Sequence, residues 1–325
     1  MEALGKCIES HRKLNTTTLK NYMRVLTRLF LASGKSTVEQ FLETAPTQLY
    51  IIKGYKQSTQ MPMLSAVIVA LDSKIKDETA HASFQSSLML YRDYMKELSP
   101  ILEHRRYEGK KSEKESDNWC SLEDLKECIP KNRKLITKLM KRTDLSWKEF
   151  NLFQNYLISC LYVQSEENPP RRLDYRNLKI IKLKDFKKEH LKDQNYLIIK
   201  SAKEKSFLFQ DFKTVKSTGV VEIPCGVQLN KILNEYIRVL NKQTIVKNNE
   251  FLLFNNKGMA VDPSGFGSNI TEAFADSKKQ ISVNLIRHIF LSKNADSWTL
   301  LKRKEMSRLM SHSLETQLTY AKINE

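Results

Sequence analysis

Residues 281–290 read Ile281-Ser-Val-Asn-Leu-Ile-Arg-His-Ile-Phe290, and residues 309–320 read Leu309-Met-Ser-His-Ser-Leu-Glu-Thr-Gln-Leu-Thr-Tyr320. In a helix over the first stretch, Asn284 and Arg287 lie one turn apart on one face, and apolar residues supply a side that packs inward. In the second stretch Ser313 is a helix N-cap, and Tyr320 lies two turns into the following helix. The pattern therefore holds an arginine on a rigid element and brings a phenol and an imidazole, that of His312, near it.

The chain is long enough for two domains and carries a strong positive charge. Its 325 residues allow each of two domains to bury its own core. Lysine and arginine number 54 against 37 aspartate and glutamate residues, a net charge of +17. Such an excess favours a polyanionic partner, because basic side chains that neutralise phosphates release counterions. A solvated basic surface is the alternative explanation of the charge.

Several classes of protein are excluded by what the sequence lacks. The five cysteines are scattered and show no CxxC spacing, which indicates a reducing, intracellular compartment without a zinc site or a disulfide framework. No apolar run approaches the length of a membrane span, and the N-terminus has no secretory signal. There is no phosphate-binding GxxxxGK[ST] loop and no HExxH motif. We therefore expect no metal, no cofactor and no membrane.

The first hundred residues read as helices. The stretch Asn15–Ser33 has apolar residues at helical spacing and is followed by Gly34, a helix stop signal. Further helical patterns lie at Ser36–Glu43, Met61–Ile75 and Phe84–Leu98. Together they predict a compact helical domain over residues 1–103. The polar face of the first helix presents Lys20, Arg24 and Arg28, which we interpret as a DNA-backbone contact or as a solvated face.

Residues 104–117 are almost without apolar side chains and are predicted to be a linker. A second domain over residues 118–325 then begins with a capped helix at Ser121. A second capping signature at Ser146 opens a strongly apolar helix, which the Asn168-Pro-Pro sequence ends.

Three short strands are predicted after this helix, at Tyr196–Lys200, Phe207–Phe212 and Val220–Pro224. An amphipathic helix at Val227–Leu240 follows them. The predicted fold class is mainly α with a small antiparallel sheet in the second domain (α+β). Lys213 lies in the turn between the second and third strands.

Four segments, taken in chain order, resemble the successive motifs of the tyrosine recombinase (integrase) family. They are Pro170-Arg-Arg-Leu-Asp-Tyr-Arg-Asn-Leu178, the turn with Lys213, the segment 284–288 and the segment 310–320. Their style is similar to that of versions from DNA viruses, virophages and eukaryotic mobile elements. The resemblance covers residues 119–320 by motif and implies a helical core-binding domain followed by a recombinase catalytic domain.

The resemblance also implies a role for each motif residue. Arg171 matches the first arginine of the family, and Asp174 matches the acid that helps to hold the arginine pair. Arg172 is the alternative to Arg171. Lys213 matches the hairpin lysine, with Lys216 as the alternative. Arg287 matches the second arginine, His312 matches the late histidine position, and Tyr320 matches the nucleophile.

One position departs from the family. Asn284 stands three residues before Arg287, where the family most often has histidine. An amide can donate a hydrogen bond to a phosphate oxygen but is no base near neutral pH. Proton removal from Tyr320 would then fall to water, to His312 or to His288, although His288 lies about 100° around the helix from Arg287 and is better interpreted as a packed or phosphate-neighbouring histidine.

The implied function is DNA strand exchange. Tyr320 would attack a phosphodiester, form a 3′-phosphotyrosyl bond and release a 5′ hydroxyl, so that neither ATP nor a metal is needed. The implied partners are duplex DNA and further copies of the chain, as a homotetramer on DNA and a monomer or dimer in solution. Its setting would be a viral or mobile genome in the nucleus or cytoplasm of a host cell. Two alternatives stay open, a type IB topoisomerase-like enzyme and a DNA-binding protein that has kept the fold and lost catalysis.

Overall fold

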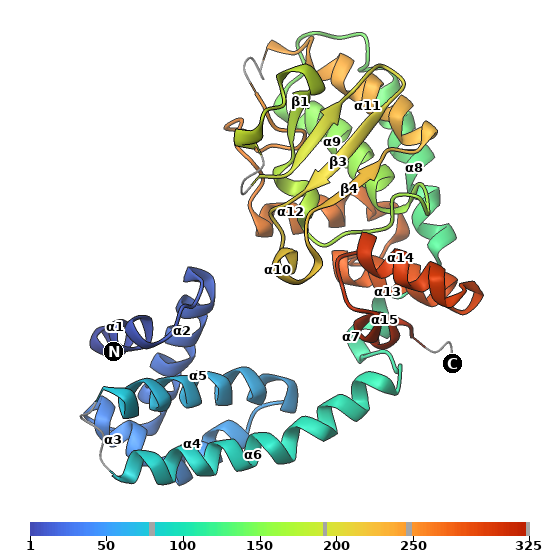
Figure 1. The fold of residues 1–325 in the computed structure, drawn as a ribbon. Coiled ribbons are helices and arrows are strands. Elements are labelled where there is room, and N and C mark those ends of the chain that lie inside the picture. The colour runs from blue at the N-terminus through green and yellow to red at the C-terminus, as the bar shows by residue number, and fades with distance from the viewer. Residues whose placement is uncertain (78–81, 191–193, 245–248, 323–325) are drawn as a thin grey trace. The chain divides into compact units, whose positions relative to one another are not determined.

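The computed structural model describes residues 1–77, 82–190, 194–244 and 249–322, which form two compact units, Met1–Glu108 and Gly109–Glu325 (Figure 1). Both units are mainly helical, and the second contains one four-stranded sheet. The predicted fold class is confirmed in this respect. None of the helices in these ranges is long and apolar enough to cross a membrane.

The described part of the first unit contains six helices, α1 (Glu2–His11), α2 (Thr16–Ser33), α3 (Val38–Glu43), α4 (Ala45–Lys53), α5 (Gln57–Lys76) and α6 (Ala82–Tyr107). Helix α2 confirms the sequence prediction at both ends. The side chain of Asn15 accepts a hydrogen bond from the backbone N–H of Thr18, and Gly34 ends the helix in the left-handed conformation with φ of 65°. Helices α1, α2, α4 and α6 all contact α5, which lies at the centre of the unit's core.

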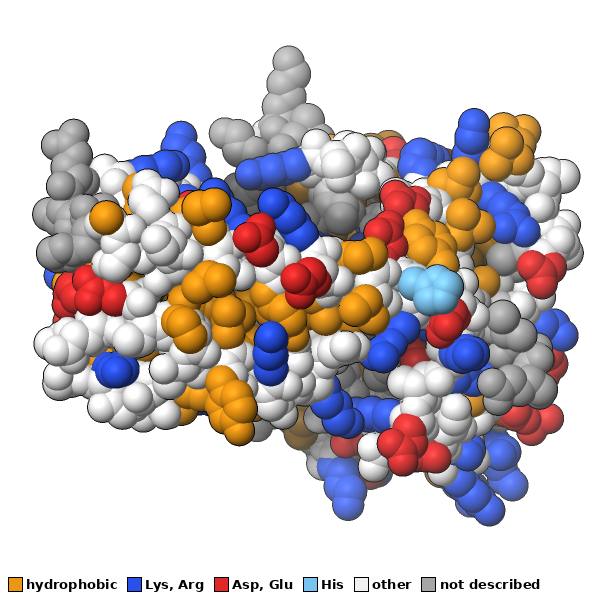
Figure 2. Space-filling view, turned by 90° about the horizontal axis from the view of Figure 1, so that it is seen from below, with side chains coloured by type: hydrophobic (Ala, Val, Ile, Leu, Met, Phe, Trp, Pro, Cys, Tyr) orange, Lys and Arg blue, Asp and Glu red, His pale blue; other side chains and the backbone are white. Residues whose placement is uncertain are grey.

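Hydrophobic side chains also gather on an outer face (Figure 2). The exposed large hydrophobic residues of α4 and α6 include Tyr50 and Met89, whose exposed fractions are 82% and 63%. Lysine and arginine side chains lie beside this hydrophobic surface (Figure 2).

The segment 104–117, expected to be a linker, is largely helical. Residues 104–107 end α6, and α7 (Glu113–Asn118) follows in the second unit. A capping box starts α7: the Ser112 hydroxyl accepts a hydrogen bond from the Glu115 N–H, while the Glu115 carboxylate accepts one from the Ser112 N–H. A helix without apolar residues thus forms here because its first turn is capped.

The second unit is built around α9 (Trp147–Val163), which is buried along most of its length. It packs against α8 (Leu122–Thr137), α11 (Val227–Leu240) and α12 (Pro263–Ala273). The predicted N-caps Ser121 and Ser146 are confirmed, each in a capping box. Helix α9 ends at Val163, five residues before the Asn168-Pro-Pro sequence that was expected to stop it.

The sheet has the order β1-β2-β3-β4, with strands β1 (Lys179–Lys182), β2 (Tyr196–Ile199), β3 (Lys205–Phe209) and β4 (Val221–Pro224). Strands β2, β3 and β4 pair antiparallel, as predicted. The structure adds a strand that was not predicted, β1, which pairs parallel with β2 and makes the sheet mixed. A parallel pair requires a crossover connection, and of the connection between these strands the structure describes residues 183–190 and 194–195.

Strand β3 is buried on both faces, which explains its continuous apolar run. Leu197, Phe207 and Phe209 lie in the main core of the unit, whereas Tyr196 and Leu208 belong to a small cluster on the opposite face. Ile181 and Phe186 pack against this small cluster and cover it.

Three helices end the chain, α13 (Val283–Asn294), α14 (Leu300–Leu309) and α15 (Leu314–Tyr320). Helix α15 contacts both α13 and α14, and α14 contacts β4. They lie below the sheet in Figure 1, on the side where the short helix α10 (Val215–Thr218) interrupts the β3–β4 connection. This packing brings the C-terminal segment to the end of the sheet that carries Lys213.

Candidate active site

Arg171 is a buried structural arginine. It has no exposed surface, and its Nε donates a 2.8 Å hydrogen bond to Oδ2 of Asp174. Its two other nitrogens donate to the Leu309 carbonyl and to the Ser311 hydroxyl. The guanidinium lies 3.9 Å from the centre of the Phe209 ring. All three nitrogens are thus bonded to the protein, and Arg171 joins the 171–174 turn to the segment before His312.

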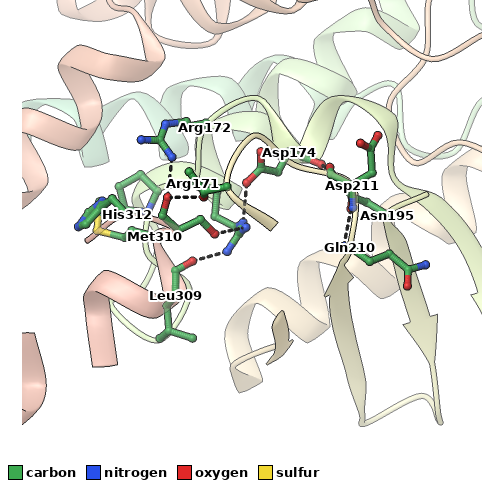
Figure 3. A network of polar contacts seen from close by, with 12 residues as sticks. Arg171, Arg172, Asp174, Asn195, Gln210, Asp211, Leu309, Met310 and His312 are labelled. Carbon is green, nitrogen blue, oxygen red and sulfur yellow. Dashed lines mark hydrogen bonds and ion pairs between the residues drawn. The ribbon is translucent and has the colours of Figure 1, made fainter. Parts of the chain in front are cut away.

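Arg172 points in a different direction (Figure 3). It is half-buried, and its Nη1 donates to the Ser311 carbonyl. With His312 and Thr214 it lines a cavity of about 470 Å³. Of the two neighbouring arginines, Arg172 is therefore the one that can reach a ligand in this cavity without leaving its own position.

Arg287 and His312 form a buried pair. Arg287, on α13, has no exposed surface. Its Nη1 donates to the carbonyls of Pro170 and Met310 at 2.8 and 3.1 Å. Its Nη2 lies 2.8 Å from Nδ1 of His312. Because a guanidinium can only donate, Nδ1 of His312 is the acceptor, and a neutral ring then carries its proton on Nε2. Burial lowers the pKa of His312 to about 3, and the charges of Arg287 and Arg172 act in the same direction. His312 is therefore a neutral hydrogen-bond donor rather than a base.

Two donors of this pair are left without a partner. Within the described part of the chain, the buried Nε of Arg287 and the buried Nε2 of His312 make no hydrogen bond. An unpaired buried N–H is costly, and it is found where a ligand or water supplies the acceptor. Burial lowers the pKa of Arg287 to about 10, so the guanidinium is still charged at neutral pH. The pair thus offers a positive charge and free donors, as an oxyanion would require.

Tyr320 covers this pair. Its ring centre lies 5.3 Å from the guanidinium carbon of Arg287, 5.5 Å from the ring centre of His312 and 4.7 Å from that of His288. Burial disfavours the phenolate, but the charges of Arg287 and Arg172 outweigh this effect, so the pKa of the Tyr320 phenol is lowered. A tyrosine with a lowered pKa beside two arginines is a better nucleophile than a free phenol.

The turn at Ser311 holds these parts together. Ser311 has a positive φ of 55°, which is uncommon for a residue other than glycine. Its hydroxyl accepts from Arg171, and its carbonyl accepts from Arg172 and, at 3.0 Å, from the hydroxyl of Thr214. The turn therefore directs His312 toward Arg287 and connects the β3–β4 connection to both arginines.

Lys213 lies beside this turn. It is exposed, and both of its chain neighbours contact the site. The ring centre of Phe212 lies 5.0 Å from the guanidinium carbon of Arg171, and Thr214 donates to the Ser311 carbonyl. Lys216 is also exposed and lies within α10, farther along the connection. The placement favours Lys213 over Lys216 as the lysine of this site.

Asn195 is a positioning residue that the sequence analysis missed. It is fully buried, and its amide nitrogen donates to the backbone carbonyls of Asp174 and Asp211 at 3.1 and 2.8 Å (Figure 3). Its amide oxygen accepts from the N–H groups of Gln210 and Asp211. Asn195 thereby fixes the start of the Lys213 connection to the turn that carries both arginines. Its only sequence signal is a polar residue directly before an apolar strand.

The comparisons with known proteins include a structural likeness. The chain resembles the solved protein described as "Crystal structure of XerA recombinase", at 14% sequence identity and a TM-score of 0.41, over 100% of this chain and 94% of that chain. No family model matches the sequence, and no curated protein matches it either. A likeness at this TM-score does not assign a function, so the function proposed below rests on the residues of the site.

Asn284 and His288 both lie on α13, but in different surroundings. Asn284 is exposed, one helical turn before Arg287 and His288. His288 is largely buried, with a side-chain exposure of 16%, and its Nδ1 lies 2.7 Å from Oε1 of Glu115. Glu115 was missed because it lies in the segment expected to be a linker. The Ser112–Glu115 capping spacing was the signal that could have shown it to be ordered.

The basic face predicted on the first unit is present. Lys20, Arg24 and Arg28 follow one another at intervals of four residues along α2, and all three are exposed. Arg28 also lies 4.9 Å above the ring centre of Tyr55. Within the described ranges, no group of three or more histidine, cysteine, aspartate or glutamate side chains is placed to hold a metal ion.

Proposed function

We propose that the protein is a tyrosine recombinase that cleaves and rejoins duplex DNA through a 3′-phosphotyrosyl intermediate. The proposal rests on one observation. Four side chains from three distant segments of the chain lie together, those of Tyr320, Arg287, His312 and Arg172. A phenol of lowered pKa beside two guanidiniums suits attack on a phosphodiester, where negative charge grows on the non-bridging oxygens.

Each residue is assigned a role in this reaction. The phenol oxygen of Tyr320 forms the bond to phosphorus, and the bond from phosphorus to the 5′ oxygen breaks. Arg287 and Arg172 bind the non-bridging oxygens, and Nε2 of His312 donates a hydrogen bond to one of them. Lys213 gives a proton to the leaving 5′ oxygen. Arg171 and Asp174 hold the turn that presents Arg172.

The proposed partners and setting follow from the same reaction. The net charge of +17 and the exposed basic face of α2 support binding of the DNA backbone. Strand exchange between two duplexes requires four cleavages, and we expect a homotetramer on DNA. We propose that the reaction integrates or resolves a viral or mobile genome in the nucleus or cytoplasm of a host cell.

A strand-exchange assay tests this function. The probe is a duplex whose sequence the protein itself selects from a random pool by binding, mixed with a longer labelled duplex of the same sequence in the presence of EDTA. We expect recombinant strands of hybrid length. Relaxation of supercoiled plasmid without hybrid strands would favour the topoisomerase-like enzyme. Binding without any cleavage would favour the DNA-binding protein without catalysis.

A further inference from the structure

The proposed reaction leaves one step without an agent, namely the removal of the proton from Tyr320. Asn284 is an amide and cannot accept it near neutral pH. Nδ1 of His312 is already the acceptor for Arg287, and its Nε2 carries the proton. The two guanidiniums can only donate. Among the described side chains in contact with Tyr320, this leaves His288.

His288 is held in the form that a base requires. Its Nδ1 lies 2.7 Å from Oε1 of Glu115. Because an ionised carboxylate can only accept, Nδ1 carries the proton of the neutral ring, and the lone pair of Nε2 is left to take up another. The other carboxylate oxygen, Oε2 of Glu115, accepts from the N–H and the hydroxyl of Ser112 at 2.9 and 2.8 Å. The carboxylate is thus fixed at both oxygens.

The charged groups around His288 agree with a neutral ring beside an ionised acid. Burial lowers the pKa of His288, Glu115 on α7 raises it, and Lys322 and Arg287 lower it further, with a net decrease. Burial disfavours the Glu115 carboxylate, but the hydrogen bonds from Ser112, the charge of Lys322 and the bond to His288 outweigh this, so the pKa of Glu115 is lowered. Near neutral pH the pair is therefore imidazole and carboxylate.

The pair lies against the nucleophile. The ring centres of His288 and Tyr320 are 4.7 Å apart, closer than the ring centres of His312 and Tyr320 at 5.5 Å. The hydroxyl of Ser292 links the backbone on either side of this contact. It donates to the His288 carbonyl at 2.8 Å and accepts from the Lys322 N–H at 2.7 Å.

We propose that Glu115 and His288 form a dyad in which His288 is the general base for Tyr320. The phenol proton passes to Nε2 of His288, directly or through one water molecule, while the phenol oxygen bonds to phosphorus and the 5′ oxygen leaves with a proton from Lys213. Glu115 fixes the ring tautomer and stabilises the imidazolium. On rejoining, the 5′ hydroxyl gives its proton to the neutral Lys213 and bonds to phosphorus, the bond from phosphorus to the Tyr320 oxygen breaks, and the imidazolium returns its proton to that oxygen. This inference rests on the proposed function, and it assigns a role to a residue pair that the motif resemblance left out.

Single-turnover cleavage of a nicked duplex of the selected sequence tests the dyad, with wild type beside His288→Gln. Glutamine keeps a polar side chain but is no base. We expect the rate to fall about 10²-fold or more, with unchanged DNA binding and thermal unfolding. The wild-type rate should fall on acidification through the pKa of His288, and this acidic limb should be absent in His288→Gln. Added imidazole should restore cleavage to His288→Gly.

Glu115→Gln adds a readout that a structural role would not change. Because the Glu115 charge raises the pKa of His288, its removal should move the acidic limb to lower pH and slow cleavage less than His288→Gln does. Glu113→Gln is the matched control, since Glu113 lies exposed on the same helix. It should leave both rate and profile unchanged.

The outcomes distinguish a failure of the proposed function from a failure of the dyad. Absence of a covalent adduct with wild type would overturn the proposed function and the dyad with it. An adduct with wild type, together with a His288→Gln rate within a few-fold of wild type, would overturn the dyad alone. A slow His288→Gln variant with an unchanged pH limb and no imidazole rescue of His288→Gly would also overturn it.

Discussion

Arg171 and Arg172 are neighbours in the chain with opposite surroundings. Arg171 is fully buried and bonded to the protein through three nitrogens, whereas Arg172 lines the cavity beside His312. The motif resemblance matched Arg171 to the first arginine of the family, with Arg172 as the alternative. In the reaction that we propose, Arg171 holds the turn and Arg172 is the arginine that binds the phosphate.

Substitution of each arginine separates the two roles. Arg171→Ala leaves Asp174 buried without its cation, and we expect a loss of about 3–5 kcal/mol in the free energy of unfolding. Arg172→Ala should change stability by about 1 kcal/mol but slow cleavage about 10²–10³-fold. Urea unfolding and single-turnover cleavage measure the two effects. A stable Arg171→Ala variant combined with a fast Arg172→Ala enzyme would reverse the assignment.

The two lysines of the β3–β4 connection give a second prediction. Lys213→Ala removes the proton donor of the leaving 5′ oxygen, and we expect cleavage to slow by about 10²–10⁴-fold. A duplex with sulfur at the 5′ bridging position should restore the rate, because a thiolate leaves without a proton. Lys216→Ala serves as the matched comparison. If Lys216→Ala is the variant that sulfur rescues, Lys216 is the acid.

Asn195 connects the arginine turn to the lysine connection, and its substitution should affect both. Asn195→Asp keeps the acceptor for Gln210 and Asp211 but loses the donor to the carbonyls of Asp174 and Asp211. Leaving such buried groups unpaired costs about 1–3 kcal/mol. We expect lower stability together with slower cleavage at saturating DNA. Slower cleavage should not be accompanied by weaker DNA binding, which a filter-binding titration checks.

His312 predicts a pH dependence of stability. Its pKa is about 3 in the folded protein and about 6.5 when unfolded. The stability that this neutral histidine contributes is therefore complete above pH about 6.5 and is lost as the pH falls toward 3, with a slope of up to ~1.4 kcal/mol per pH unit. His312→Gln keeps an acceptor for Arg287. Its free energy of unfolding should depend less steeply on pH between about pH 4 and 6, measured in the same buffers. Equal slopes for the two proteins would contradict a buried neutral His312.

The basic face of α2 predicts a salt-dependent contribution to DNA binding. If Lys20 and Arg24 each contact a phosphate, the double alanine variant should reduce the slope of log affinity against log salt by about two. The same substitutions at Lys6 and Lys96, which are exposed elsewhere in the first unit, change the charge equally. That control should leave a slope near the wild-type value. Equal slopes for both double variants would show a general charge effect instead.

Much of the fold could be predicted from periodicity and caps. Helix α2 follows its predicted bounds because Asn15 and Gly34 are strong end signals, and α11 coincides with the amphipathic stretch Val227–Leu240. Helix α12 was not predicted, although Asp262 caps it, because glycine and serine residues within it are typical of irregular segments. Strand β1 was missed because four residues with lysine at both ends show little alternation.

The site was predictable only as a set of residue types. The order of the motifs nominated Arg171, Lys213, Arg287, His312 and Tyr320, but side-chain direction depends on packing between distant segments. The different surroundings of the Arg171 and Arg172 side chains depend on the Ser311 turn, which lies some 140 residues later in the chain. The Glu115–His288 contact likewise joins residues that no local pattern connects.

Covalent attachment of Tyr320 to DNA is the step on which the proposed function depends. Wild type and Tyr320→Phe are incubated in EDTA with duplexes of the selected sequence, each carrying a nick at a different position across it, and are separated on a denaturing gel. We expect a protein–DNA adduct with wild type whose DNA is joined through its 3′ phosphate, and no adduct with Tyr320→Phe. An adduct that persists in Tyr320→Phe, or no adduct with wild type on any nicked duplex that it binds, would show that Tyr320 is not the nucleophile of a DNA-cleaving enzyme.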